Sequence, residues 1–195
     1  GYGYWVYDSG DGAYAKAPVY DWQEIVPENG GKGATLNIEA DYNNKHDIKV
    51  VNLPFTFKFY GREFNQATIC ANGWIALGVT EQATFRNWRL PGPLGPRPII
   101  AAFWDNLKVI SSSSRGVFAY YDLENHTYIV QWEQTEVFGL NSPNTFQVIL
   151  YDPAYYITDT GDGPIKIQYK VFNNTNNQPS VSHQNYGNCG NYCTV

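Results

Sequence analysis

Apolar and polar side chains alternate with a period of two along several segments, and this alternation constrains the fold more than any other feature. Residues 55–60 read FTFKFY, with a phenylalanine at every second position, and residues 164–172 read PIKIQYKVF. Successive side chains of a strand point to opposite faces of a sheet, so this period predicts strands with one buried face. In the second segment, the side chains expected on one face are Ile165, Ile167, Tyr169 and Val171.

Further strand-like segments follow along the chain. Residues 67–78 contain Asn72 and Gly73, a pair that favours a hairpin or a bulge because both residues accept positive φ. Residues 97–107 hold a continuous apolar run, typical of a strand buried on both faces. Residues 116–134 read as two strands around a polar turn from Asp122 to His126, and residues 144–152 alternate again.

No segment shows sustained helical spacing, and the one helix-like start, residues 22–31, is interrupted by Pro27 and two glycines. The sequence therefore predicts an all-β fold, an antiparallel β-sandwich of about eight to ten strands.

The length and the charge limit the organisation and the partners. The 195 residues fit one domain with extensions, and the net charge is −5 with scattered Lys and Arg. We expect an aromatic-rich N-terminal arm or added strands over 1–48, a sandwich core over 49–172 and a polar tail over 173–195. A nucleic-acid partner would need a basic patch, and membrane insertion would need about 18 consecutive apolar residues. We expect neither.

Three cysteines divide into two groups. Cys70 lies in an apolar strand segment, where a small buried thiol is the favoured interpretation. Cys189 and Cys193 lie in the stretch NCGNYC, and for an exported protein we predict a disulfide between them. The alternative is half of a zinc site together with His183, which would still need another ligand.

The pattern Asp-x-Gly-Asp-Gly occurs twice, at residues 8–12 and 159–163. Calcium takes about six to eight oxygen ligands. Asp-Gly is also good turn chemistry, because glycine accepts positive φ and aspartate bonds its own backbone. We favour turns and expect no cofactor, with calcium as the alternative. The candidate calcium ligands are Asp8, Asp11, Asp159 and Asp162.

One long stretch resembles a known family. Residues 53–78, LPFTFKFYGREFNQATICANGWIALG, resemble the opening of nidogen-type (NIDO) extracellular domains, and PIIAAFWDNL at 98–107 looks like the Phe-Trp-Asp stretch of that family. The resemblance covers roughly residues 50 to 172. The chain is also similar to accessory modules of secreted bacterial peptidases. Both resemblances imply an extracellular interaction module without catalysis, and neither implies a ligand.

Catalytic chemistry is hard to find in the sequence. No metalloprotease, hydrolase or nucleotide-binding motif occurs, and the histidines, at positions 46, 126 and 183, lie in polar turn-like segments. Asp105 is the most interesting carboxylate because it follows an apolar run, but a strand-end carboxylate is the favoured interpretation. We expect no enzyme activity and assign no catalytic residue.

Aromatic residues make up 16% of the chain, more than one sandwich core needs. The candidate interface aromatics are Tyr2, Tyr4, Trp5 and Tyr7, ahead of the core region. We predict a structural or adhesive module at the cell surface or outside the cell. It would be a self-assembling surface or filament subunit, or an accessory domain of a larger secreted protein, and its partners would be copies of itself or other surface proteins.

The alternative function is a carbohydrate-binding module that stacks exposed Tyr and Trp on glycans. The role of the N-terminal arm is also open at this point. It can complete the sheet of another copy, or it can fold back on its own domain.

Overall fold

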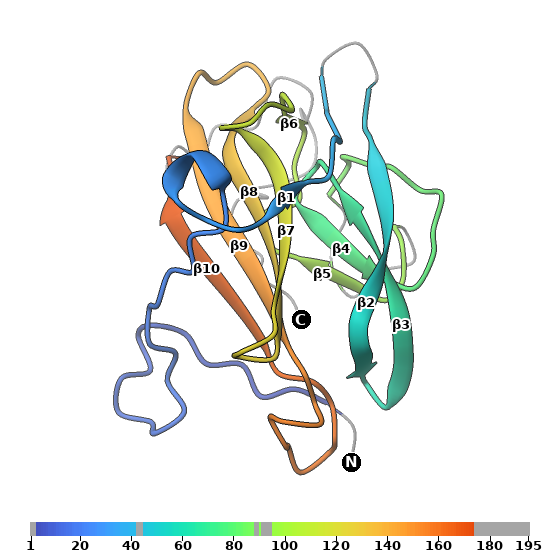
Figure 1. Ribbon diagram of the computed structural model, residues 1–195, viewed down its shortest axis with the longest axis vertical. Helices are drawn as coiled ribbons and strands as arrows, with labels where there is room; N and C mark the ends of the chain where they lie inside the picture. Colours follow the sequence, from blue (N-terminus) through green and yellow to red (C-terminus); the bar gives the residue numbers. More distant parts are fainter. Residues whose placement is uncertain (1–2, 42–44, 88–89, 91–94, 174–195) are drawn as a thin grey trace.

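Two antiparallel sheets form the fold in the computed structural model, which describes residues 3–41, 45–87, 90 and 95–173 (Figure 1). The larger sheet has the order β1 (Ala34–Thr35), β7 (Gly116–Asp122), β8 (Thr127–Val137), β9 (Pro143–Tyr151) and β10 (Ile165–Val171), with β6 (Leu107–Lys108) also paired to β8. The smaller sheet has the order β2 (Ile48–Phe59), β3 (Arg62–Cys70), β4 (Trp74–Leu77) and β5 (Ile99–Ala101).

The predicted all-β antiparallel sandwich is confirmed. The described residues contain one short 3-10 helix, η1 (Pro27–Asn29), and no α-helix. Accordingly, no helix in this part of the chain is long and apolar enough to cross a membrane. The predicted hairpin at Asn72 and Gly73 joins β3 to β4, and the predicted turn from Asp122 to His126 joins β7 to β8.

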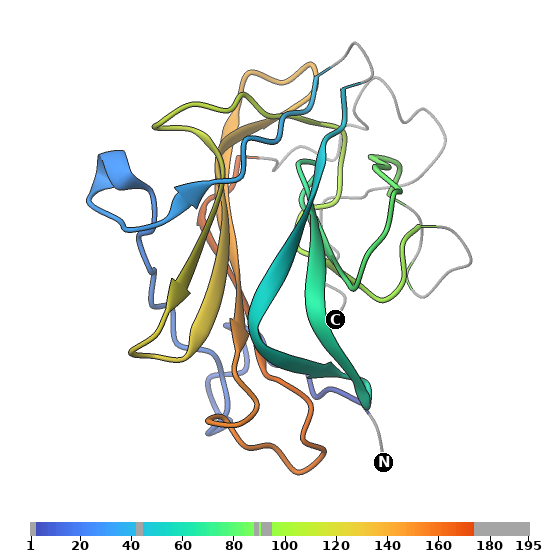
Figure 2. The same ribbon diagram turned by 45° about the vertical axis from the view of Figure 1, so that its right-hand side comes forward.

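The core lies between the two sheets, which Figure 2 shows as separate layers. Trp132 of β8 is fully buried there and connects the layers. Its ring stacks on Phe146 with centroids 5.0 Å apart, and its Nε1 donates a hydrogen bond to the carbonyl of Cys70 in the opposite sheet, at 3.0 Å. One side chain thus supplies apolar area and a polar contact across the sandwich.

The alternation in β10 holds only in part. Ile165, Ile167 and Tyr169 pack against the core as predicted. A register shift between Tyr169 and Val171 then reverses the faces, so Val171 is 38% exposed and Phe172 packs against the core instead. The prediction for Val171 was wrong because a bulge inserts an extra residue into the strand.

The apolar run at 97–107 is not one strand. Only Ile99–Ala101 pair within the smaller sheet, and Leu107–Lys108 belong to the larger one. Between them the chain leaves the first sheet, and the Phe103 amide donates to the carbonyl of Gly73 at 3.0 Å. The run is buried because it crosses between layers, rather than because it is a central strand.

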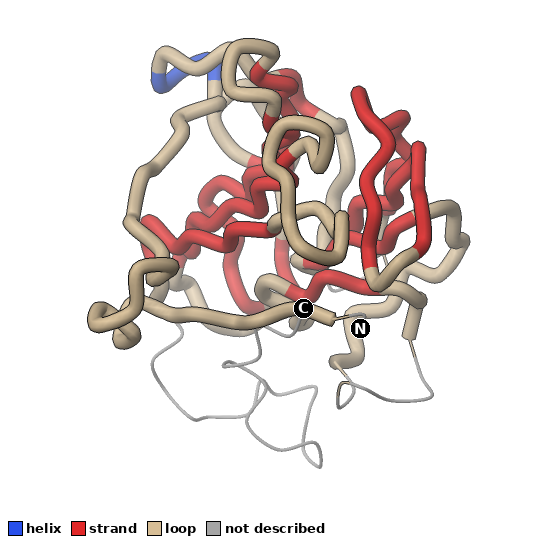
Figure 3. The backbone as a smooth tube through the Cα atoms, turned by 90° about the horizontal axis from the view of Figure 1, so that it is seen from below, coloured by secondary structure: helices blue, strands red, loops and turns tan. Residues whose placement is uncertain are grey.

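The segment before β2 is built into the sandwich. β1 pairs with β7, Ala40 bridges to Val109, and Ile25 and Val26 are buried. Figure 3 looks along the sandwich from below, and in it the loop segment that follows the start of the chain runs around the outside of the larger sheet to η1. This outer path determines where the candidate site lies.

Candidate functional site

Three glutamines form a continuous row across the outer face of the larger sheet. Gln131 of β8, Gln147 of β9 and Gln168 of β10 are register partners, and all three are buried. Gln168 donates to Gln147 at 2.9 Å, and Gln147 donates to Gln131 at 3.3 Å. A buried amide is costly unless its donors and acceptors are all used, so this glutamine row requires further partners.

Gln147 and Gln168 find those partners in the main chain of residues 21–26, which we call the docked segment. The side-chain oxygen of Gln168 accepts from the Asp21 amide at 2.8 Å, and its nitrogen donates to the Asp21 carbonyl at 2.7 Å. Gln147 makes the same pair of bonds with the main chain of Gln23, at 3.3 and 3.0 Å. The two bonded residues, Asp21 and Gln23, are two positions apart, as expected for an extended chain. The glutamine side chains therefore bind the docked segment much as the edge of a neighbouring strand would.

Apolar contacts anchor the other end of the docked segment. Ile25 and Val26 pack into a cluster with Phe118, Ile129 and Ile149 on the outer face. The chain then turns back tightly, and the Gly33 amide donates to the Ile25 carbonyl at 2.7 Å. The docked segment therefore covers the outer face of the sheet. Its first residues are held by main-chain hydrogen bonds, and Ile25 and Val26 are held by apolar packing.

An ionic cluster lies between these two ends. The Glu24 carboxylate accepts from Lys170 Nζ at 2.9 Å, from the Val26 amide at 3.0 Å and from Gln131 at 3.2 Å. Partial burial raises the pKa of Glu24, but the hydrogen bonds, above all that from Lys170, outweigh it, and the net pKa is lowered. Lys170 also lies over the Trp22 ring, 5.3 Å from its centroid.

A second carboxylate in this cluster behaves in the opposite way. Glu133 is 5% exposed and accepts from the same Gln131 nitrogen at 2.8 Å. Burial raises its pKa. Two carboxylates with separated pKa values are the elements of acid–base catalysis. Here both hold the amide that borders the docked segment, so the arrangement fits attachment of the arm better than a reaction.

This cluster predicts an opposite response in two matched variants. Because the folded-state pKa of Glu24 is lowered, its contribution to stability is present above its unfolded pKa and is lost as the pH falls through the folded value. Glu133 has a raised pKa, so its charge costs stability as the pH rises from its unfolded pKa through its higher folded value. At neutral pH we expect Glu24→Gln to lose about 1–2 kcal/mol and Glu133→Gln to gain a smaller amount.

Thermal unfolding of both variants from about pH 3 to about pH 8 checks this expectation. The difference between wild type and Glu24→Gln should shrink as the pH falls into the acidic range. A Glu133→Gln variant that is destabilised at neutral pH would contradict the assignment of Glu133 as an unfavourable buried charge.

A groove of 490 Å³ opens beside the docked segment. One wall is formed by residues 23–25 and by Gly30 to Lys32, and the other by the β7–β8 turn from Asp122 to Glu124, with Tyr120 and Ile129 also lining it. The groove thus lies between two parts of the chain that are remote in sequence, and the docked segment supplies part of one wall.

The two Asp-x-Gly-Asp-Gly copies form hydrogen-bonded turns. In the first, the Gly10 amide donates to Asp8 Oδ1 at 2.7 Å, and the Asp8 amide donates to Asp11 Oδ2 at 2.9 Å. In the second, Gly161 has a φ of 72° and its amide donates to the Thr158 carbonyl at 3.1 Å.

The carboxylates of these turns are not gathered into one site. Asp162 is buried and accepts from the Gly61 amide at 2.7 Å, and Asp159 lies in the same turn. Within the described part of the chain no group of three or more His, Cys, Asp or Glu residues could hold a metal ion. Calcium binding stays a prediction without a site among these residues.

The candidate interface aromatics separate into different environments. Tyr4 Oη donates to the Gly163 carbonyl at 3.0 Å, and its ring packs against Phe59 with centroids 5.2 Å apart. Phe59 belongs to the smaller sheet and Gly163 precedes β10 of the larger one, so Tyr4 anchors the arm to both. In contrast, Trp5 is 88% exposed.

Tyr7 lies near Tyr14, with ring centroids 6.0 Å apart. Tyr2 lies outside the described residues. The predicted disulfide between Cys189 and Cys193, and the alternative zinc site with His183, also lie outside them.

The family-like motifs form a structural junction. The Leu107 amide donates to Asn72 Oδ1 at 3.2 Å, and the Nε1 atoms of Trp74 and Trp104 both donate to the Thr84 carbonyl at 3.0 Å. Asp105 is buried in the connection between β5 and β6 and accepts from the Asn106 amide at 2.7 Å. These contacts join the β3–β4 hairpin to the chain crossing.

Two neighbours of this junction, His46 and Cys70, lie in packed environments. His46 Nδ1 lies 3.1 Å from the Asn72 amide nitrogen, and burial lowers the pKa of the imidazole. Cys70 is buried as predicted, and burial raises the pKa of its thiol to about 12. A neutral imidazole and a protonated thiol are typical of packing roles.

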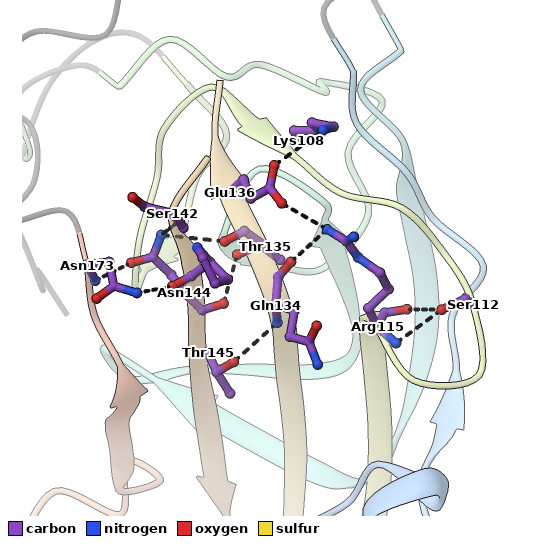
Figure 4. A network of polar contacts seen from close by, with 11 residues as sticks. Lys108, Ser112, Arg115, Gln134, Thr135, Glu136, Ser142, Asn144, Thr145 and Asn173 are labelled. Atoms are coloured by element: carbon purple, nitrogen blue, oxygen red, sulfur yellow. Dashed lines mark hydrogen bonds and ion pairs between the residues drawn. The ribbon is translucent and has the colours of Figure 1, made fainter. Parts of the chain in front are cut away.

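A second polar network lies at the end of β8 (Figure 4). Glu136 is paired with Lys108 at 3.2 Å and with Arg115 at 3.4 Å. Arg115 also donates to the carbonyl of Gln134, which has a φ of 52° in an irregular part of the β8–β9 ladder. The network stabilises this irregularity and fixes the end of the sheet.

The sequence contained one overlooked signal for the glutamine row. Each of three strand segments carries a glutamine on the face opposite its core residues. Uncharged amides at such positions in adjacent strands favour a hydrogen-bonded row, but the register that aligns them is not visible in the sequence.

Comparison with known proteins agrees with the sequence resemblance and extends it. The family model described as NIDO related matches residues 20–190. The match begins at the docked segment, well before the stretch of roughly 50 to 172 that carried the resemblance. No curated protein and no solved structure matches the chain. The similarity to modules of secreted bacterial peptidases stays a prediction. Since the model covers most of its length, the chain belongs to the NIDO-related family.

Proposed function

We propose that this chain is a non-catalytic, extracellular structural module that assembles with copies of itself by exchanging its N-terminal arm. The NIDO-related family indicates an extracellular β-module. The observation that carries the proposal is the way the arm is held. Gln147 and Gln168 bind main-chain groups of the docked segment, so an identical arm from another copy satisfies the same row without any new contact.

The arm has two anchors joined by an exposed linker. Tyr4 is one anchor and the docked segment is the other. Between them, Trp5, Val19 and Tyr20 are exposed. A linker with few contacts lets the Tyr4 anchor reach a neighbour at little cost, whereas exchange of the docked segment opens the turn of residues 27–33 that follows it, as in domain swapping. Reciprocal exchange gives a dimer, and head-to-tail exchange gives a filament.

Exposed apolar side chains support an adhesive surface near the Tyr4 anchor. The arm and the β9–β10 connection meet at the lower end of the sandwich in Figure 1, where Tyr4 bonds to Gly163. Trp5, Tyr155 and Ile157 of these two segments are exposed. Exposed apolar groups on neighbouring segments are typical of interaction surfaces. The alternative, a carbohydrate-binding module using exposed Tyr and Trp, rests on the same kind of side chain and stays a prediction.

Light scattering over a range of concentrations tests the assembly. We expect the full chain to form oligomers whose mass rises with concentration, and a chain lacking residues 1–22 to remain monomeric. Deleting the turn at 8–12 keeps both anchors but shortens the linker, so it should shift the population toward oligomers. If the full chain and both deletion variants are monodisperse monomers at high concentration, arm exchange is wrong.

A further inference from the structure

We propose that the groove beside the docked segment binds a short, uncharged glycan segment. This site is separate from the exposed aromatics of the arm, and it does not depend on assembly. Its volume of 490 Å³ falls within the range of about 300–1,000 Å³ for small-ligand sites. The side chains that argue for the ligand are Glu24, Lys32, Tyr120, Asp122 and Leu123.

The acceptor groups of the groove are held rigid before any ligand arrives. Asp122 Oδ1 accepts from the amides of Glu124 and Asn125, at 3.1 and 3.2 Å, and Oδ2 accepts from the Asn125 side chain at 2.7 Å. Glu24 is fixed more completely, because it accepts from Lys170 and Trp22 on one oxygen and from the Val26 amide and Gln131 on the other, so it shapes the wall and Asp122 is the acceptor for a ligand. Ionised oxygens with locked positions form strong hydrogen bonds to sugar hydroxyls at a small entropic cost.

These carboxylates are poorly suited to a free cation. Their oxygens already accept hydrogen bonds from the protein, and Lys32 and Lys170 place positive charge close to Asp122 and Glu24. The groove lining thus carries the carboxylates of Glu24, Asp122 and Glu124 and the ammonium group of Lys32, and Lys170 pairs with Glu24 beside it. A hydroxyl group both donates and accepts, so it matches this mixture of carboxylate and ammonium groups better than a charged ligand does.

The groove also offers an apolar surface for the carbon–hydrogen face of a sugar ring. Tyr120 is half-buried and packs against the cluster that contains Ile25 and Ile129. Leu123 stands at the rim and is 67% exposed. An aromatic ring held by its own packing provides a rigid apolar contact for the face of a sugar ring.

Binding should be coupled to docking of the arm, because the ligand touches both walls. One wall belongs to the docked segment and the other to the β7–β8 turn. A ligand that contacts both stabilises the closed arrangement by mass action. A glycan should therefore raise the melting temperature of the full chain.

Titration of the full chain on an array of neutral and acidic oligosaccharides tests the groove. We expect saturable binding to neutral glycans that Tyr120→Ala weakens at least about tenfold, while Tyr120→Phe keeps it. Tyr14→Ala and Trp5→Ala, which alter exposed rings outside the groove, serve as matched controls and should leave binding unchanged. Circular dichroism of each variant separates loss of binding from loss of folding.

Two results would overturn the proposal. One is the absence of neutral-glycan binding at about 1 mM by the folded full chain. The other is binding that survives Tyr120→Ala but is lost in Trp5→Ala, which would assign the glycan to the arm. Neither result bears on assembly, because scattering measures arm exchange without glycan.

Discussion

The Gly73→Ala variant should lose about 4 kcal/mol or more of unfolding free energy, enough to abolish folding of many domains. Gly73 has a φ of 82°, and a Cβ placed there would lie 1.9 Å from the carbonyl oxygen of Phe103. Backbone atoms of a buried crossing cannot move aside as the end of a flexible side chain can. The substitution therefore also breaks the hydrogen bond from the Phe103 amide to Gly73. Chemical denaturation, or the soluble yield, measures the effect.

Gly30→Ala is the matched control for this prediction. Gly30 has a nearly equal φ of 89°, but a Cβ there would meet no atom within 4 Å. The control isolates the cost of the left-handed conformation, about 1–2 kcal/mol. Equal losses in the two variants would show that backbone strain, and not the contact between the hairpin and the crossing, is what makes Gly73 necessary.

A large loss, about 3–5 kcal/mol, is also expected for Trp132→Ala. The substitution leaves a cavity at the centre of the core and removes the stacking on Phe146. It also leaves the carbonyl of Cys70 without its hydrogen bond across the sandwich. Trp132→Phe should keep most of the packing and lose a smaller part, about 1–3 kcal/mol, through the unpaired carbonyl.

Trp5→Ala provides the control, because the Trp5 side chain is 88% exposed. Its unfolding free energy should lie within about 0.5 kcal/mol of the wild type when measured on the monomer by denaturant titration. A Trp132→Ala variant with equally unchanged stability would contradict the assignment of Trp132 as the central contact between the sheets.

The residues that carry the family resemblance are thus architectural. Asn72, Gly73 and the stretch from Phe103 to Asp105 join the hairpin of one sheet to the chain that crosses toward the other. The features that we connect with function lie elsewhere, on the outer face of the larger sheet, where the docked segment, the glutamine row and the groove adjoin. A match to the family therefore indicates the scaffold and leaves the ligand to be found.

Local patterns in the sequence determined the fold class. The period of two in 55–60 and 164–172 is a property of neighbouring residues, and the Asn72–Gly73 hairpin needs only local backbone freedom. Both were predictable because each depends only on residues that are adjacent in the sequence. The outward turn of Val171 was not, because the bulge depends on how β10 aligns with β9.

Tertiary structure alone decided the outer face. Gln131, Gln147 and Gln168 are far apart in the chain, and only the register of three strands brings their amides into one row. A period of two predicts that these side chains point away from the core, but not whether water or another segment meets them. The docked segment covers them because the buried amides need its main-chain groups and because Ile25 and Val26 bury apolar area beside them. Contacts between segments this far apart give no periodic pattern in the sequence. These contacts attach the arm to the sheet and form the groove.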